Sequence, residues 1–288
     1  MSDYVIFTDS ACDLPPALLA ELGVRCESLS FRFEGENKEW GNGEMEAKEF
    51  YARMRKGMVA TTSAVNTNTF KRAFEEELKQ GRDVLYLGFS SGLSATYQSG
   101  LMAARELEEE YPGRRVEAVD TLCASAGFGM LVGLVVERKR AGATLDEAAQ
   151  FARDTIPHLC HWFTVEDLKY LKRGGRVSAA AALLGGMLGI KPVLHTDNEG
   201  HLTPKAKVRG RKASLEALAD RYLALAEKPG EGPIYISHGD CMADVETLKN
   251  MLWTKCGAKV DLVCDVGPVI GAHSGPGTVA LFFLGKER

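Results

Sequence analysis

Several common markers of nucleotide and redox chemistry are missing from this sequence of 288 residues. It contains no G-x-x-x-x-G-K-S/T segment and no G-x-G-x-x-G that follows a strand and opens a helix, so neither ATP nor a dinucleotide has its usual phosphate-binding loop. The seven cysteines form no C-x-x-C pair, and their odd number argues against a disulfide framework. We therefore expect no cofactor, and a separate protein would have to supply any nucleotide.

An excess of charge of one sign is also lacking. The chain has 35 lysines and arginines against 39 aspartates and glutamates, and basic residues are interleaved with acidic ones, which argues against a nucleic-acid partner. The most apolar segment, Leu122–Val136, is interrupted by Ser125 and by glycines and is shorter than the roughly 20 residues that cross a bilayer. With no signal peptide after Met1, we expect a cytoplasmic protein with reduced thiols and no stable membrane insertion.

Strand-like and helical segments alternate through the first half, which predicts a doubly wound, mostly parallel α/β sheet. From His158 strands dominate, and a hairpin at Thr196–Gly200 indicates antiparallel pairing. We expect a Rossmann-like α/β domain over residues 1–157 and an α+β domain over 158–288, with a ligand between them. The predicted strands are Tyr4–Phe7, Val24–Phe33, Val84–Phe89, Val116–Val119, Leu159–Thr164, Lys191–Thr196, Leu202–Arg209, Ile234–Ser237, Val260–Cys264 and Thr278–Leu284. The predicted helices are Pro15–Leu22, Glu44–Lys56, Asn66–Lys79, Ser94–Glu110, Cys123–Arg140, Leu145–Thr155 and Ala179–Leu184.

One strand-to-helix junction predicts an anion site. The apolar run from Asp83 ends in Ser90, Ser91 and Gly92, and helical spacing resumes at Ser94. The first amides of a helix lack partners within the helix and carry the positive end of its dipole, so such a junction attracts a carboxylate or phosphate. Neutral hydroxyls, rather than a lysine, would add the side-chain hydrogen bonds.

Four further segments are candidates for the same site. Ser10 follows the first strand, and Thr62 and Ser63 precede a helix, so their hydroxyls are expected at the same sheet edge, although each is also consistent with simple helix capping. In the second half, Leu171–Ser178 surrounds a glycine pair with basic residues, which is also consistent with a helix C-cap. Gly267–Gly277 reads as a long glycine-rich loop, which favours close approach of the backbone to a ligand.

Two other kinds of site were weighed. His158, Cys160 and His161 suggest a metal, but in the expected strand the two histidines face opposite sides, so we predict none. Gly88–Gly92 matches G-x-S-x-G, which would make Ser90 the nucleophile of an esterase or thioesterase, with Asp240 or Asp265 and then His273 following in hydrolase order. Against that alternative, the chain has no oxyanion segment of the His-Gly-Gly-Gly type after an early strand.

Taken together, these segments resemble the DegV family. The match rests on Thr8–Ser10, Thr62–Ser63, Ser91–Ser99, Leu171–Ser178 and Gly267–Gly277, in the same order across nearly the whole chain. The resemblance implies a fatty-acid-binding protein of two α/β domains that is not itself an enzyme. It would be the binding subunit of a bacterial fatty-acid kinase, presenting the carboxylate of a long-chain fatty acid to a separate ATP-binding kinase subunit that makes acyl phosphate for phospholipid synthesis.

The resemblance also implies roles for individual residues. Thr62 and Ser94 fall on the family's carboxylate-binding positions, with Ser10, Ser63, Ser91 and Gly92 in supporting loops. Arg176 and His273 match the arginine and histidine associated with phosphoryl transfer. The chain departs from many relatives at Ala64 and Val65, where Gln-Pro is common, and this difference is expected to affect either the conformation of the loop beside Thr62 or the preferred acyl chain.

Overall fold

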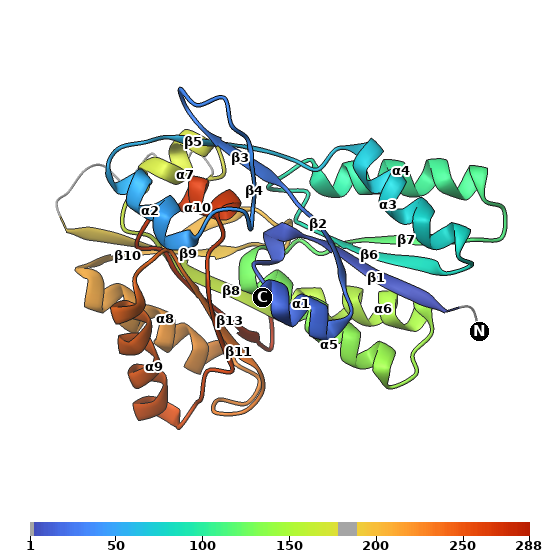
Figure 1. Ribbon diagram of the computed structural model, residues 1–288. Helices are drawn as coiled ribbons and strands as arrows, with labels where there is room; N and C mark the ends of the chain where they lie inside the picture. The colour runs from blue at the N-terminus through green and yellow to red at the C-terminus, as the bar shows by residue number, and fades with distance from the viewer. Residues whose placement is uncertain (1–2, 178–188) are drawn as a thin grey trace.

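The structure is a computed structural model that describes residues 3–177 and 189–288. Within these ranges the strands form three sheets (Figure 1). The first is parallel, with strand order β2-β1-β6-β7, and confirms the predicted α/β sheet. Its strands are β1 (Tyr4–Asp9), β2 (Arg25–Glu27), β6 (Asp83–Gly88) and β7 (Val116–Asp120).

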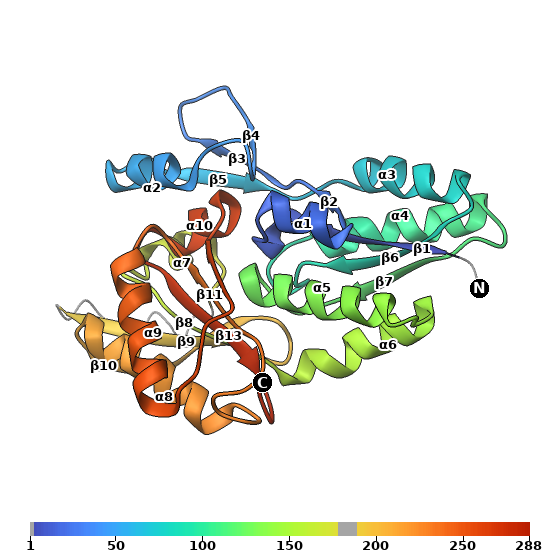
Figure 2. The same ribbon diagram turned by 60° about the horizontal axis from the view of Figure 1, so that its bottom comes forward.

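Helices cover both faces of the parallel sheet. In Figure 2, α3 (Thr67–Lys79) and α4 (Thr96–Glu110) lie above it, and α5 (Ser125–Arg140) and α6 (Leu145–Thr155) lie below it. α6 has the predicted bounds because Thr144 and Glu147 form a reciprocal capping box that fixes its first turn. α1 (Pro16–Leu22) follows the 3₁₀ turn η1 (Ser10–Cys12).

The second sheet contains six strands in the order β10-β9-β8-β13-β11-β12, of which only β11 and β12 pair in parallel. After η2 (Ile156–His158), its strands are β8 (Leu159–Thr164), β9 (Ile190–Thr196), β10 (Leu202–Arg209), β11 (Ile234–His238), β12 (Leu262–Asp265) and β13 (Val279–Leu284). β9 and β10 form the predicted hairpin. One face is covered by α8 (Arg211–Leu225) and α9 (Met242–Cys256).

α5 lies between the two large sheets. It contacts α6 and η1 in the first half and β8, β11 and β13 in the second half. Its residues from Ser125 to Val132 are all buried, because a helix that is apolar all round is covered on every side. One hydrophobic core therefore runs from the parallel sheet into the second half, and the domain boundary expected near Pro157 stays a prediction.

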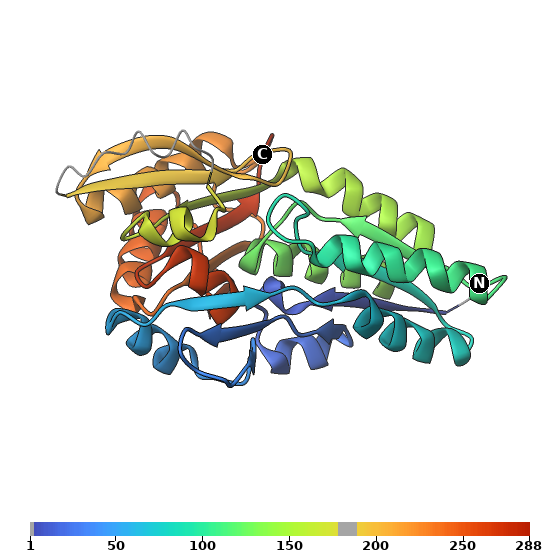
Figure 3. The ribbon, with the colours of Figure 1, turned by 90° about the horizontal axis from the view of Figure 1, so that it is seen from above.

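The third sheet was not predicted. Strands β4 (Trp40–Gly41), β3 (Ser30–Phe33) and β5 (Ala60–Ser63) pair antiparallel, next to α2 (Ala47–Arg55). Figure 3 shows this segment extending alongside the second half. There Phe31 and Phe50 share a core with Tyr170 of α7 (Lys169–Gly174) and Ala272 of α10 (Pro268–Ser274).

The prediction of a single strand over Val24–Phe33 was wrong. The chain pairs with β1 up to Glu27 and then crosses to the third sheet from Ser30. At the crossing, the backbone amide of Leu29 donates to the Ser10 hydroxyl at 2.9 Å. Both parts are extended, so hydrophobic alternation does not reveal the change of sheet.

Two of the functional segments also differ from expectation, and a third agrees with it. Thr61–Ser63 lies in β5 and not at the edge of the parallel sheet. The expected loop over Gly267–Gly277 contains α10 (Pro268–Ser274), which begins with proline at its first position. α7 (Lys169–Gly174) ends at Gly175 in the left-handed conformation, as expected for a C-cap. The predicted helix Ala179–Leu184 lies outside the described residues.

Candidate functional site

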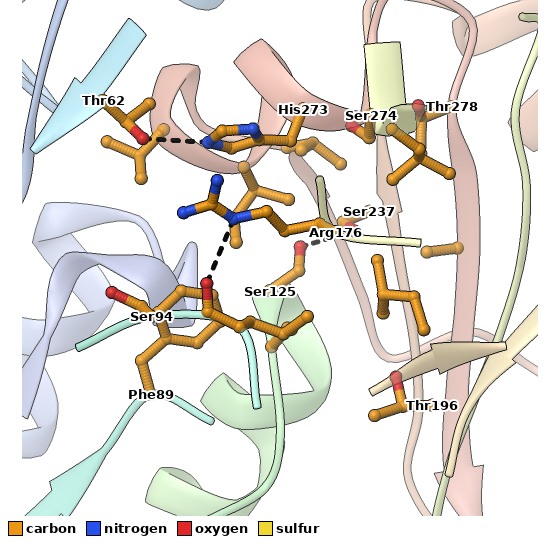
Figure 4. Close-up of a pocket in the computed structure, with 18 of the residues that line it drawn as sticks. Thr62, Phe89, Ser94, Ser125, Arg176, Thr196, Ser237, His273, Ser274 and Thr278 are labelled. Atoms are coloured by element: carbon orange, nitrogen blue, oxygen red, sulfur yellow. Dashed lines mark hydrogen bonds between the residues drawn. The ribbon is translucent and has the colours of Figure 1, made fainter. Parts of the chain in front are cut away.

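A cavity of about 220 Å³ lies where the two halves meet (Figure 4). Most of its wall is apolar, with hydroxyl groups at a few places. The apolar lining includes Leu29, Phe89, Leu93, Phe163, Leu171, Leu202, Val266, Val269, Ile270, Ala280 and Phe282. A mostly apolar cavity with a few converging polar groups is the usual form of a small-molecule site.

Thr62 and His273 meet at one end of this cavity. β5 carries Thr62 and α10 carries His273, and Thr62 Oγ1 lies 2.9 Å from His273 Nε2. Burial, reinforced by the positive charge of Arg176, lowers the pKa of His273 to about 4. The imidazole is therefore neutral near pH 7. The His273 ring lies so close to the backbone of residue 174 that only glycine fits there, because a Cβ would lie 2.2 Å from His273 Nδ1.

Arg176 and Ser94 lie at the same end (Figure 4). Arg176 follows the C-cap of α7, and its guanidinium donates to the carbonyl oxygens of Leu93, at 3.2 Å, and of Gly174. The Ser94 hydroxyl accepts from the Thr96 amide at 3.2 Å and lies 2.9 Å from Thr96 Oγ1. Ser94 thus lies just before α4, whose N-cap is Ala95, at the predicted strand-to-helix junction. The structure brings Thr62, Ser94, Arg176 and His273 into one cavity.

The residues expected to support this site are placed differently. Ser63 lines the cavity, whereas Ser10, Ser91 and Gly92 are not among the lining residues. Ser91 is exposed, and its amide donates to Asp120 Oδ1 at 3.2 Å. A Cβ on Gly92 would lie 2.9 Å from the Glu199 carbonyl oxygen, so glycine here lets the β9–β10 turn approach the β6–α4 loop.

The geometry does not favour Ser90 as a nucleophile. Ser90 is fully buried, and its hydroxyl donates to the Gly200 carbonyl at 2.9 Å, so its proton is directed at the backbone. The expected base, His273, contacts Thr62 instead. The expected acids are also engaged elsewhere, because Asp240 pairs with Arg55 and Asp265 lies 3.7 Å from His238.

Sequence reasoning missed the hydroxyl groups deeper in the cavity, which are Ser125, Thr196, Ser237, Ser274 and Thr278. Ser125 Oγ donates to Asp13 Oδ2 at 2.5 Å and lies 2.9 Å from Ser237 Oγ. Burial raises the pKa of Asp13 to about 7. Ser125 interrupts an apolar run in the sequence, and this interruption was the only available signal of a polar group there.

His158 lies in η2 rather than in the strand that carries His161. Within residues 3–177 and 189–288, no group of three histidine, cysteine or acidic side chains is arranged to hold a metal ion. Among the same residues, no helix has the length and apolar character needed to cross a membrane.

Comparison with known proteins agrees with this architecture. A family model described as "Uncharacterised protein, DegV family" matches residues 3–286. A DegV domain-containing protein of Clostridium perfringens is 43% identical over 100% of this chain and 99% of its own length. The structure of a fatty-acid-binding DegV family protein from Thermus thermophilus has a TM-score of 0.88 and 33% identity, covering 98% of this chain and 99% of the other. A DegV lipid-binding protein from Thermotoga maritima has a TM-score of 0.83 and 30% identity, covering 99% of both chains. The chain described here belongs to the DegV family.

Proposed function

We propose that this chain binds a long-chain fatty acid in the cavity between its two halves, with the carboxylate at the Thr62–Ser94 end. The observation that carries the proposal is the Thr62–His273 pair at the end of an otherwise apolar cavity. If His273 Nε2 carries the proton of the neutral ring, it donates to Thr62 Oγ1, which leaves the threonine proton for a ligand carboxylate. The fatty-acid-binding relative from Thermus thermophilus and the lipid-binding relative from Thermotoga maritima support the same class of ligand.

The apolar wall supplies most of the affinity in this proposal. Burying one methylene group contributes about 0.8 kcal/mol, so a tail of about 16 carbons contributes on the order of 12 kcal/mol before the costs of ordering the ligand. The hydroxyl groups at the polar end contribute less and decide which end of the ligand is held there.

We further propose that the bound carboxylate is presented to a separate ATP-binding kinase subunit. A carboxylate oxygen would attack the γ-phosphorus of ATP, the bond to the β-phosphate oxygen would break, and acyl phosphate and ADP would leave. The chain has no phosphate-binding loop of its own, which is why the nucleotide must come with the partner. Arg176 would stabilise charge on the transferred phosphoryl group, and neutral His273, whose single ring proton is directed at Thr62, would hold that hydroxyl in place beside the reacting carboxylate.

Titration of lipid-free protein with palmitate or oleate tests the binding proposal. Thr62→Val removes the hydroxyl with little change in shape, and Ser94→Ala removes the second one. Each is expected to weaken binding roughly tenfold, since losing one hydrogen bond to a charged group costs about 1–3 kcal/mol. Thr61→Val is a matched control on the same strand, because the Thr61 hydroxyl faces the Arg32 carbonyl outside the cavity. Protein that purifies without fatty acid and takes up neither acid saturably would refute the proposal.

A further inference from the structure

The inner wall of the cavity contains a chain of hydrogen bonds with a defined direction. Asp13 Oδ2 accepts the only proton of Ser125 at 2.5 Å. The 2.9 Å contact between Ser125 Oγ and Ser237 Oγ therefore uses the proton of Ser237. Both serine protons are committed, and the Ser237 oxygen is left as an acceptor that faces the cavity.

A second polar group on this wall is unpaired. Ser274 has a relative exposure of 5%, and its Oγ has no hydrogen-bond partner among the described residues. It ends α10, lines the same cavity and can both donate and accept. A buried hydroxyl without a partner is costly, so such a group usually meets a ligand or an ordered water.

A third lining residue, His161, adds no donor. Its Nδ1 lies 3.0 Å from the Leu159 carbonyl oxygen, so Nδ1 carries the ring proton. Burial lowers the pKa of His161 well below its usual value, so the ring is neutral. Nε2 is then an acceptor, 3.4 Å from the Ala124 amide. This inner wall therefore offers oxygen and nitrogen acceptors, with Ser274 as its free donor.

We propose that this wall is a subsite for a hydroxyl group carried along the acyl chain, which donates to Ser237 Oγ and accepts from Ser274. An alcohol satisfies both requirements, whereas a carbonyl group only accepts and an unsubstituted chain does neither. Figure 4 shows both serines apart from Thr62 and Ser94, so the subsite lies away from the carboxylate end. The inference rests on the proposed fatty-acid site and names a substrate class, hydroxylated long-chain fatty acids.

Competition between stearic acid and a series of stearic acids hydroxylated at successive mid-chain carbons tests the subsite. The lipid-free protein is used at about pH 8, where Asp13 is ionised. One member of the series is expected to bind roughly five- to tenfold more tightly than stearic acid, as one added hydrogen bond allows. Ser237→Ala should abolish this preference, measured as the affinity for the hydroxylated acid relative to stearic acid in the same variant, and Ser274→Ala should reduce it. Ser99→Ala, on α4 outside the cavity lining, is the control.

The outcomes separate the two proposals. If stearic acid binds and no hydroxylated member binds more tightly to the wild-type protein, the subsite is refuted and the fatty-acid site stands. If the wild-type protein prefers a hydroxylated acid and Ser237→Ala keeps that preference, Ser237 Oγ is not the acceptor for the ligand hydroxyl. If neither stearic acid nor any hydroxylated acid binds, the proposed function itself fails and the subsite fails with it.

Discussion

At the residue scale, the polar end of the cavity pairs a neutral histidine, His273, with a positively charged arginine, Arg176. Burial and the neighbouring guanidinium hold the pKa of His273 at about 4, so the permanent positive charge belongs to Arg176 alone. Its two backbone hydrogen bonds leave part of the guanidinium available. In the proposed reaction, Arg176 is thus suited to the charge of the incoming phosphoryl group, while Thr62 and Ser94 would hold the carboxylate.

Arg176→Ala is therefore expected to separate binding from turnover. Fatty-acid affinity should stay within a few-fold of wild type, because the tail is still buried, while acyl-phosphate formation with ATP and a cognate kinase subunit should fall roughly a hundredfold. Arg173→Ala, which changes an exposed arginine on α7 just before Arg176, should leave both quantities unchanged. Equal losses of affinity and turnover in Arg176→Ala would show that the arginine simply holds the ligand.

At the scale of elements, prediction succeeded where the local sequence carries its own signals. The predicted bounds of α6 match the structure, in which Thr144 and Glu147 form a capping box at its start. The β9–β10 hairpin was predicted from its turn residues. α10 was missed because it contains Gly271 and is flanked by Gly267 and Gly275, and glycine lowers helix propensity. Gly271 is needed in α10 because a Cβ there would lie 2.5 Å from the Tyr51 hydroxyl. Long-range packing against α2 is invisible in local sequence.

Gly174 provides a test of how α7 and α10 position the site. In Gly174→Ala, the new Cβ would meet His273 Nδ1 at 2.2 Å, so the ring must move and its 2.9 Å contact with Thr62 is lost. Fatty-acid affinity, measured by titration, should fall by roughly tenfold.

Gly133→Ala is the matched control for that substitution. It lies within α5, where the nearest atom to a new Cβ is the Tyr235 hydroxyl at 3.9 Å. This variant should bind normally and gain up to about 1 kcal/mol of stability from helix propensity. Unchanged affinity in Gly174→Ala would mean that the position of His273 does not matter for the carboxylate.

At the scale of the whole molecule, the polar end of the site could be predicted and the inner wall could not. Thr62, Ser94, Arg176 and His273 stand in recognisable segments. Ser237 reaches the cavity because β11 pairs with β13, opposite Ala280, and meets Ser125 from α5. That arrangement depends on the packing of the second sheet against α5, which no single segment encodes.

The buried carboxyl of Asp13 links this packing to pH. Burial raises its pKa from 3.8 to about 7, so between these values the folded protein retains a proton that the unfolded chain has released. Asp13 therefore favours folding at low pH, and this contribution is lost as pH rises through about 7. The free energy of unfolding of wild type minus that of Asp13→Asn should fall by up to a few kcal/mol between about pH 4 and pH 7.

Urea unfolding of both proteins at a series of pH values measures this difference. Asp9, whose pKa burial also raises to about 7, is present in both proteins and cancels in the subtraction. A difference that is constant with pH, or that rises, would contradict the assigned protonation of Asp13.

The position of α5 between the two sheets also limits how this chain can diverge. Its side chains from Ser125 to Val132 meet the first half on one side and the second half on the other. A recombination that joined the first half of one relative to the second half of another would present a mismatched surface along this helix, at the cost of cavities or overlaps in the core. The two halves are thus expected to be inherited together, and a new ligand preference would arise by point substitutions within the cavity rather than by exchange of halves.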